Sequence, residues 1–293
     1  MFIVDLLAIC QARNQLYTLV RAEYQQRESL KEFCEFCDVE FHDILRHVVT
    51  RWLSLNPAIT RLLQNWDPLK SYLISIGEEC PRHLKELLKL TEDAAVVEGE
   101  ADIVEVYLLF CNNVMCLFEE VVKKLEKNVT TSVDLYSIME CFLKRLFQRR
   151  DNGFYGYLTR QKLQRLSPSD ADGARQEFTA FLDTAISYVR KRFDFSEENW
   201  YFHRQPISLA SVKISFDDME KIIERLHLAG RLNISMAELY EECVTATSLL
   251  KHLTKEHQEK EKWQSKGTAE KWMEILQAAD LPNMQAVSFT LQY

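Results

Sequence analysis

The chain has 293 residues, of which 47% are hydrophobic and 27% are charged, values close to the averages of soluble globular proteins. Only 7 glycines and 6 prolines are present, which favours long helices over a turn-rich β fold. The net charge of -8 gives the chain as a whole no attraction for nucleic acid, so a nucleic-acid-binding face would have to be local.

The cysteines and the start of the chain indicate the compartment. The eight cysteines are scattered through apolar helical patterns, which predicts reduced thiols and excludes a disulfide framework. The opening MFIVDLLAICQ carries Asp5 within its apolar run and has no basic start, so it is a poor signal peptide. No run approaches the roughly 18–20 apolar residues of a membrane span. We therefore expect a nuclear or cytoplasmic protein that has no membrane partner.

The first third of the chain changes pattern near residue 38. Apolar residues recur at helical spacing from residue 1 to about residue 35, which predicts a long helix. DVEFHDILRHVVT (38–50) then ends in β-branched residues and predicts a strand over 44–49. Thr50-Arg51-Trp52 follows at the expected transition from strand to helix.

An apolar stripe marks the next helix. Pro57 stands in the favoured first turn, and apolar residues follow at spacings of three and four from Ile59 to Leu73. The stripe is interrupted at Asp67-Pro68, where we expect the helix to kink or restart. Trp66 lies on this stripe and is predicted to be a core residue.

The middle of the chain predicts a helical bundle. Residues 101–126 are apolar on more than one side, which is typical of a central helix. A second helix is expected to run from Leu135 to Leu146. SPSDADG (167–173) has the composition of a turn.

The last hundred residues alternate between connections and helix starts. Residues 198–216 are expected to be irregular, and Ser215 and Ser235 are predicted to begin helices, the second with a capping box. HLTKEHQEKEKWQSKG (252–267) is expected to be a polar linker, after which Thr268 caps a last pair of short helices. The predicted fold is mostly α, with at most one or two strands.

Two basic clusters are candidates for a local nucleic-acid face. LKRLFQRR (143–150) is followed by three further basic residues, and YVRKRF (188–193) lies downstream. Solvated helix faces are the alternative interpretation of both clusters. The side chains that we select as candidate phosphate contacts are Lys144, Arg145, Arg149 and Arg150.

The sequence predicts neither a metal site nor a cofactor site. Cys34 and Cys37 are followed by His42 and His47, but only four residues separate Cys37 from His42, against about twelve in ordinary zinc fingers. The acidic pair Asp217-Asp218 is explained by its place at a helix start. No glycine-rich phosphate loop or hydrolase motif is present, so we predict no catalytic residue, no cofactor and no small-molecule substrate.

A long stretch that includes Thr50-Arg51-Trp52 resembles a known family. LKEFCEFCDVEFHDILRHVVTRWLSLNPAITRLLQNWDPLKSYLISIGEECPRHLKELL (30–88) is similar to the middle of hAT-superfamily transposases and their domesticated relatives, which carry Thr-Arg-Trp and a second tryptophan in the following helix. The similarity continues through three further segments, YLLFCNNVMCLFEEVVKKLEK, FDFSEEN and KWMEILQAADLPNMQAVSFTLQY.

The resemblance implies an RNase H-like core interrupted by an all-helical insertion. It divides the chain into residues 1–66 with the start of the core, residues 67–255 with the insertion, and residues 256–293 with a linker and the last helices of the core. In the family, the tryptophan stacks on a flipped base, which makes Trp52 a candidate stacking residue and Arg51 and Arg46 candidate nucleic-acid contacts. For Trp52, packing in the core is the alternative role.

The resemblance does not carry over the family's catalytic acids. hAT transposases use an Asp-Asp-Glu triad that holds two divalent metals, and the matching segments contain none of the three positions. We expect a truncated, catalytically inactive, transposon-derived protein that retains nucleic-acid or protein binding, with DNA, a second copy or a full-length relative as partner. A fragment of an active transposase that transfers DNA strands is the first alternative, and a helical scaffold unrelated to DNA is the second.

Overall fold

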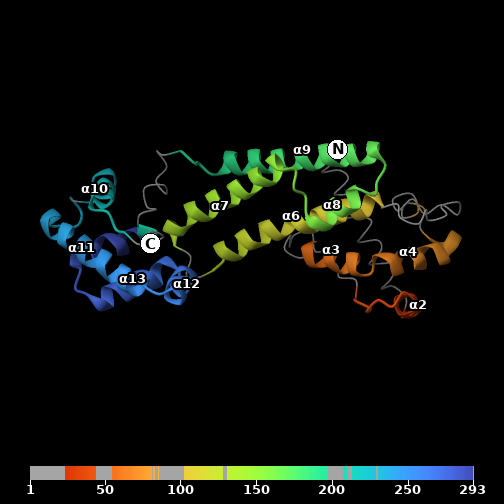
Figure 1. The fold of residues 1–293 in the computed structure, drawn as a ribbon, viewed down its shortest axis with the longest axis horizontal. Coiled ribbons are helices and arrows are strands. Elements are labelled where there is room, and N and C mark those ends of the chain that lie inside the picture. The colour runs from red at the N-terminus through yellow and green to blue at the C-terminus, as the bar shows by residue number, and fades with distance from the viewer. Residues whose placement is uncertain are drawn as a thin grey trace. The chain divides into compact units, whose positions relative to one another are not determined.

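The mostly helical fold is confirmed. In the residues that it describes, the computed structural model contains twelve α-helices, one 3-10 helix and no strand (Figure 1). The described residues are 24–43, 55–80, 82, 85, 102–127, 131–196, 207–209, 213–228 and 230–292.

Several predictions fall on residues outside this description. They are the strand at 44–49, the first part of the predicted N-terminal helix, and the side chains of Arg46, Arg51 and Trp52. The RNase H-like core therefore stays a prediction.

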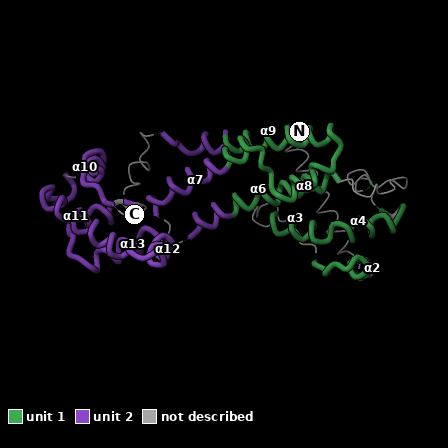
Figure 2. The backbone as a smooth tube through the Cα atoms, in the orientation of Figure 1, with its two compact units in different colours: residues 1–119, 146–186 green, residues 120–145, 187–293 purple. Residues whose placement is uncertain are grey.

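The chain divides into two compact units (Figure 2). Unit 1 contains residues 1–119 and 146–186, and unit 2 contains residues 120–145 and 187–293. Helices α6, α7 and α9 each contribute residues to both units. The predicted domain boundaries at residues 66 and 255 both fall inside a unit, and the family-based division stays a prediction.

Unit 1 is built around aromatic rings on α6 and α9. The fully buried Phe110 ring stacks on Phe178 with a centroid separation of 4.0 Å, and Tyr155 packs edge-on against both rings. The helices that contribute to this unit are α2 (Tyr24–Phe36), α3 (Leu55–Gln64), α4 (Trp66–Ser75), the 3-10 helix η2 (Gly77–Glu79), α6 (Ile103–Leu125), α7 (Ser132–Asp151), α8 (Tyr157–Leu163) and α9 (Pro168–Arg192). The predicted helix at 101–126 is thus confirmed as α6.

The predicted interruption of the apolar stripe is confirmed, but it lies at Asn65 and not at Asp67-Pro68. Pro68 is tolerated in the first turn of α4, where its missing N–H would have no helical partner. The buried Asn65 side chain accepts a hydrogen bond from the His42 N–H (3.3 Å) and donates to the His42 and Arg61 carbonyls. Trp66 is buried, as the stripe predicts.

The prediction that SPSDADG (167–173) forms a turn is wrong, because α9 begins at Pro168. Proline is favoured in the first turn of a helix, and the Ser167 hydroxyl accepts a hydrogen bond from the Asp170 N–H (3.1 Å), as an N-cap does. Asp170 also lies in the first turn, where the helix dipole favours a carboxylate. The same residue types favour turns and helix starts, and here the helix start is formed.

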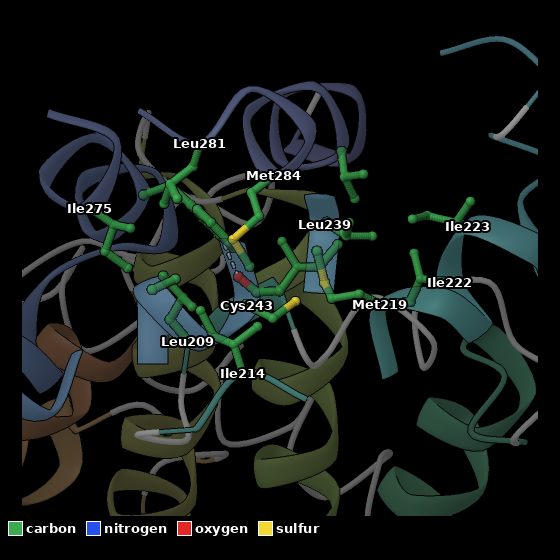
Figure 3. Packing of buried hydrophobic residues seen from close by; sticks show 14 of the residues in the cluster. Leu209, Ile214, Met219, Ile222, Ile223, Leu239, Cys243, Ile275, Leu281 and Met284 are labelled. Atoms are coloured by element: carbon green, nitrogen blue, oxygen red, sulfur yellow. Dashed lines mark hydrogen bonds between the residues drawn. The ribbon is translucent and has the colours of Figure 1, made fainter. Parts of the chain in front are cut away.

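A hydrophobic cluster to which the C-terminal helices contribute lies in unit 2 (Figure 3). Trp272 is buried in it and donates its indole N–H to the Ile207 carbonyl (2.7 Å). Besides the parts of α6, α7 and α9, the unit contains α10 (Phe216–Arg225), α11 (Met236–Leu253), α12 (His257–Ser265), α13 (Thr268–Ala278) and α14 (Pro282–Gln292). The predicted last pair of short helices is confirmed as α13 and α14.

The prediction that residues 252–267 form a polar linker is wrong. They contain α12, whose first turn is supported by a hydrogen bond from the Glu256 N–H to the Glu259 carboxylate (3.3 Å). One apolar residue, the buried Trp263, fixes this helix to unit 2. A helix that buries so little has almost no hydrophobic periodicity, so its sequence has the composition of a linker.

The helix starts at Ser215 and Ser235 are confirmed, but the predicted capping box at Ser235 does not form. Its side chain makes no capping hydrogen bond, and its backbone N–H donates instead to the Asn283 side chain (2.8 Å). Thr268 is likewise not a cap: it is the first residue of α13, and its hydroxyl donates to Asp134.

Candidate nucleic-acid interface

The two candidate residues in unit 2, Lys144 and Arg145, each contact a carboxylate. Lys144 pairs with Glu140 one turn earlier on α7 (2.9 Å), and its side chain is 66% exposed. Arg145 pairs with Glu120 of α6, which also accepts a hydrogen bond from Lys124. These two hydrogen bonds lower the pKa of Glu120 from 4.5 to about 2. An exposed pair on one helix is weak, so Lys144 is the more available of the two cations.

The candidates in unit 1, Arg149 and Arg150, are also engaged within the protein. Arg149 donates to the Asn113 side chain, and its guanidinium lies 5.5 Å from the centre of the Phe154 ring. Arg150 pairs with Asp151 (2.8 Å) and Asp183 (3.1 Å), and these hydrogen bonds raise its pKa. Much of the cluster's charge is therefore used in contacts that join helices.

The basic residues just after the cluster differ in their partners. Lys162 on α8 pairs with Glu105 on α6 (2.7 Å). Arg160 and Arg165 are exposed, and neither forms an ion pair within the part of the chain that the structure describes. We call residues 149–165 the basic segment, because it holds five basic residues and one acidic residue.

The second predicted cluster, YVRKRF (188–193), covers the C-terminal end of α9 and the residue after it, in unit 2. Tyr188 is exposed, and the Arg192 guanidinium lies 5.0 Å from the centre of its ring. Positive charge here also complements the helix dipole, which gives this cluster a structural explanation of its own.

The sequence patterns did not predict a group of exposed aromatic residues inside the basic segment. Phe154 is 42% exposed, Tyr157 is 67% exposed and Leu158 is 56% exposed, whereas Tyr155 between them is buried. We call residues 153–158 the aromatic turn; it comprises the end of the link from α7 to α8 and the first two residues of α8 (Figure 1). The sequence does show three aromatic residues close together in GFYGY (153–157). Which of their rings is buried, however, depends on contacts with α6 and α9.

Other polar clusters of the described residues have structural roles. The Glu242 carboxylate accepts hydrogen bonds from Asn283 and Met284 at the start of α14. Lys271 of α13 is buried, which lowers its pKa, while the charge of Asp134 opposes this shift. The Cys34 thiol, whose pKa is raised by burial, points to the Asn65 side chain at 3.9 Å.

No family model, curated protein or solved structure matches the chain. None of the helices in the described residues has the length and apolar character needed to cross a membrane.

Proposed function

We propose that the chain is a binding protein of hAT-transposase origin, without catalysis of its own, that contacts nucleic acid through the basic segment of unit 1. The observation that carries this proposal is a local excess of positive charge in a chain whose net charge is -8. Within that segment, Arg160 and Arg165 are exposed and are held by no ion pair among the described residues. Cations of this kind bind phosphates and release the counterions around them.

The hAT origin rests on the resemblance of the Thr-Arg-Trp stretch and the three segments after it. The segments that carry the resemblance contain none of the family's three catalytic acids, and our proposal is therefore limited to binding. Arg46, Arg51 and Trp52 stay candidate contacts of a second nucleic-acid site.

A protein-binding scaffold is the second candidate function. It is favoured by the ion pairs that engage Arg145 and Arg150, because these pairs reduce the charge that phosphates could meet. Nucleic-acid binding through the basic segment requires the positive charges of Arg160 and Arg165, whereas a protein-binding scaffold does not depend on them.

The double variant Arg160→Glu/Arg165→Glu tests the proposed function. We expect it to weaken binding of a fluorescein-labelled DNA by at least about tenfold at about 50 mM salt, because both phosphate contacts become repulsive. Fluorescence anisotropy with the full chain measures the affinity, and circular dichroism checks that the fold is unchanged.

A matched control is the double variant Arg231→Glu/Lys255→Glu in unit 2. These two cations are also exposed and without ion pairs among the described residues, so the variant makes the same change in net charge. Equal losses in the two variants would show a non-specific effect of net charge, and no loss in either would overturn the proposal.

A further inference from the structure

The aromatic turn is built so that its rings alternate between the interior and the solvent. Tyr155 points inward, where its hydroxyl is hydrogen-bonded to Thr179 (2.8 Å) and its ring packs on Phe110 and Phe178. Phe154 and Tyr157, on either side of it, are exposed. Exposure of single apolar residues is ordinary, but two rings and Leu158 within five positions form a local apolar surface.

The backbone of the turn is held in place by specific contacts. The Phe154 N–H donates to the Arg149 carbonyl (2.9 Å), and the Arg160 N–H donates to the Gly156 carbonyl (2.9 Å). Gly156 has a φ of 121° and lies against the Asn113 side chain, so that a Cβ at this position would come within 2.9 Å of it. Only glycine satisfies both conditions. The exposed rings therefore sit on a fixed backbone, which reduces the entropy lost when they bind a partner.

Cationic and hydrogen-bonding groups surround the exposed rings. The Arg149 guanidinium lies over Phe154, and the Gln161 amide donates to the Tyr157 hydroxyl (2.9 Å). Arg160 follows Tyr157 by three positions on α8, a spacing that places two side chains on one helix face. The one acidic residue of the basic segment, Asp151, is paired with Arg150. The charge around the rings thus favours an anionic partner.

We propose that Phe154 and Tyr157 form a stacking site for unpaired bases, so that unit 1 binds single-stranded nucleic acid in preference to duplex. This inference rests on the proposed function and specifies the class of ligand. Flat aromatic rings beside arginines bind single strands, because every base offers a face for stacking and every phosphate a charge for the arginines. In a duplex the base faces are covered by neighbouring bases, and only the phosphate contacts remain.

Tyr157 and Phe154 lie three residues apart, so their Cα atoms are separated by at most about 11 Å. One strand can therefore reach both rings and the Arg160 guanidinium at the same time. Because stacking contacts the faces of the bases and forms no hydrogen bonds with their edges, we expect little sequence preference.

The test compares a labelled oligothymidine of about 20 nucleotides with a duplex of equal length, both titrated with the full chain. We expect Phe154→Ala and Tyr157→Ala each to weaken single-strand binding by about tenfold, and to leave duplex binding unchanged. Tyr157→Phe keeps the aromatic ring and is expected to retain single-strand binding. Tyr157→Leu keeps an apolar side chain without the ring and is expected to lose single-strand binding. Tyr240→Ala, at an exposed tyrosine of unit 2, is the matched control and is expected to bind like the unaltered chain.

The outcomes separate this inference from the proposed function. If both ligands bind equally and the alanine variants change neither, the stacking site is wrong while the basic segment still binds phosphates. If Tyr157→Leu binds as well as Tyr157→Phe, the ring is not stacking and the inference fails. If neither ligand binds, the proposed function fails together with the inference.

Discussion

Replacing Glu242 by alanine is expected to lower the free energy of unfolding of unit 2 by about 3–4 kcal/mol. Glu242 is only 7% exposed, and its carboxylate accepts three hydrogen bonds at the start of α14. The donors are the Asn283 N–H (3.1 Å), the Asn283 side-chain amide (2.6 Å) and the Met284 N–H (2.7 Å). Alanine would leave all three donors buried without an acceptor and would remove a negative charge from the positive end of a helix.

The same network joins the start of α11 to that of α14. Ser235 is the residue immediately before α11. Its backbone N–H donates a hydrogen bond to the side chain of Asn283, which Glu242 holds in place. Loss of Glu242 therefore loosens both helix starts, which explains why we expect an effect larger than that of an ordinary helix cap.

Denaturant unfolding followed by circular dichroism measures the Glu242→Ala effect. Glu241→Ala is the matched control, because Glu241 precedes it on α11 but is exposed, and we expect a change within about 0.5 kcal/mol. Glu242→Gln should lie between the two, since its amide keeps one acceptor oxygen and adds donors with no partner. A Glu242→Ala protein as stable as the Glu241→Ala protein would disprove this description of the network.

Phe110→Ala is expected to destabilise unit 1 by about 3–5 kcal/mol. The Phe110 ring is fully buried and packs against the rings of Phe178 and Tyr155, so its removal leaves a cavity in this aromatic cluster. Because Tyr155 anchors the aromatic turn, we also expect the turn to become more accessible to proteolysis at Phe154.

Phe110→Leu provides the comparison, because leucine fills part of the volume without the ring contacts. We expect it to cost about 1–2 kcal/mol and to leave the aromatic turn resistant to chymotrypsin. If alanine and leucine at position 110 gave equal stability, packing of this aromatic cluster would not support unit 1 as we describe.

The helices that could be predicted from the sequence are those with a clear apolar face. α6 buries residues along most of its length, and its predicted range of 101–126 lies within two residues of the observed Ile103–Leu125. The burial of Trp66 is predicted correctly because it lies on the apolar stripe. α12 could not be found in this way, since Trp263 is its one buried residue.

The hydrogen-bond network of Glu242 and the candidate nucleic-acid interface both depend on contacts between residues far apart in the sequence. Glu242 and Asn283 are separated by 41 positions, and Arg150 and Asp183 by 33. The sequence shows that LKRLFQRR is basic, but not which of its cations meet carboxylates on another helix. Similarly, GFYGY contains three aromatic rings, and only the neighbouring helices determine that Tyr155 is the one that is buried.

Binding of nucleic acid by the full chain, measured across a range of salt concentrations, tests the central claim most directly. With Arg160 and Arg165 as the phosphate contacts in unit 1, the logarithm of the affinity for a single strand is expected to fall against the logarithm of salt with a slope of about -1.4. The slope is expected to approach zero in the Arg160→Glu/Arg165→Glu variant. Absence of binding at low salt, or an affinity that does not respond to salt in the unaltered chain, would contradict the account.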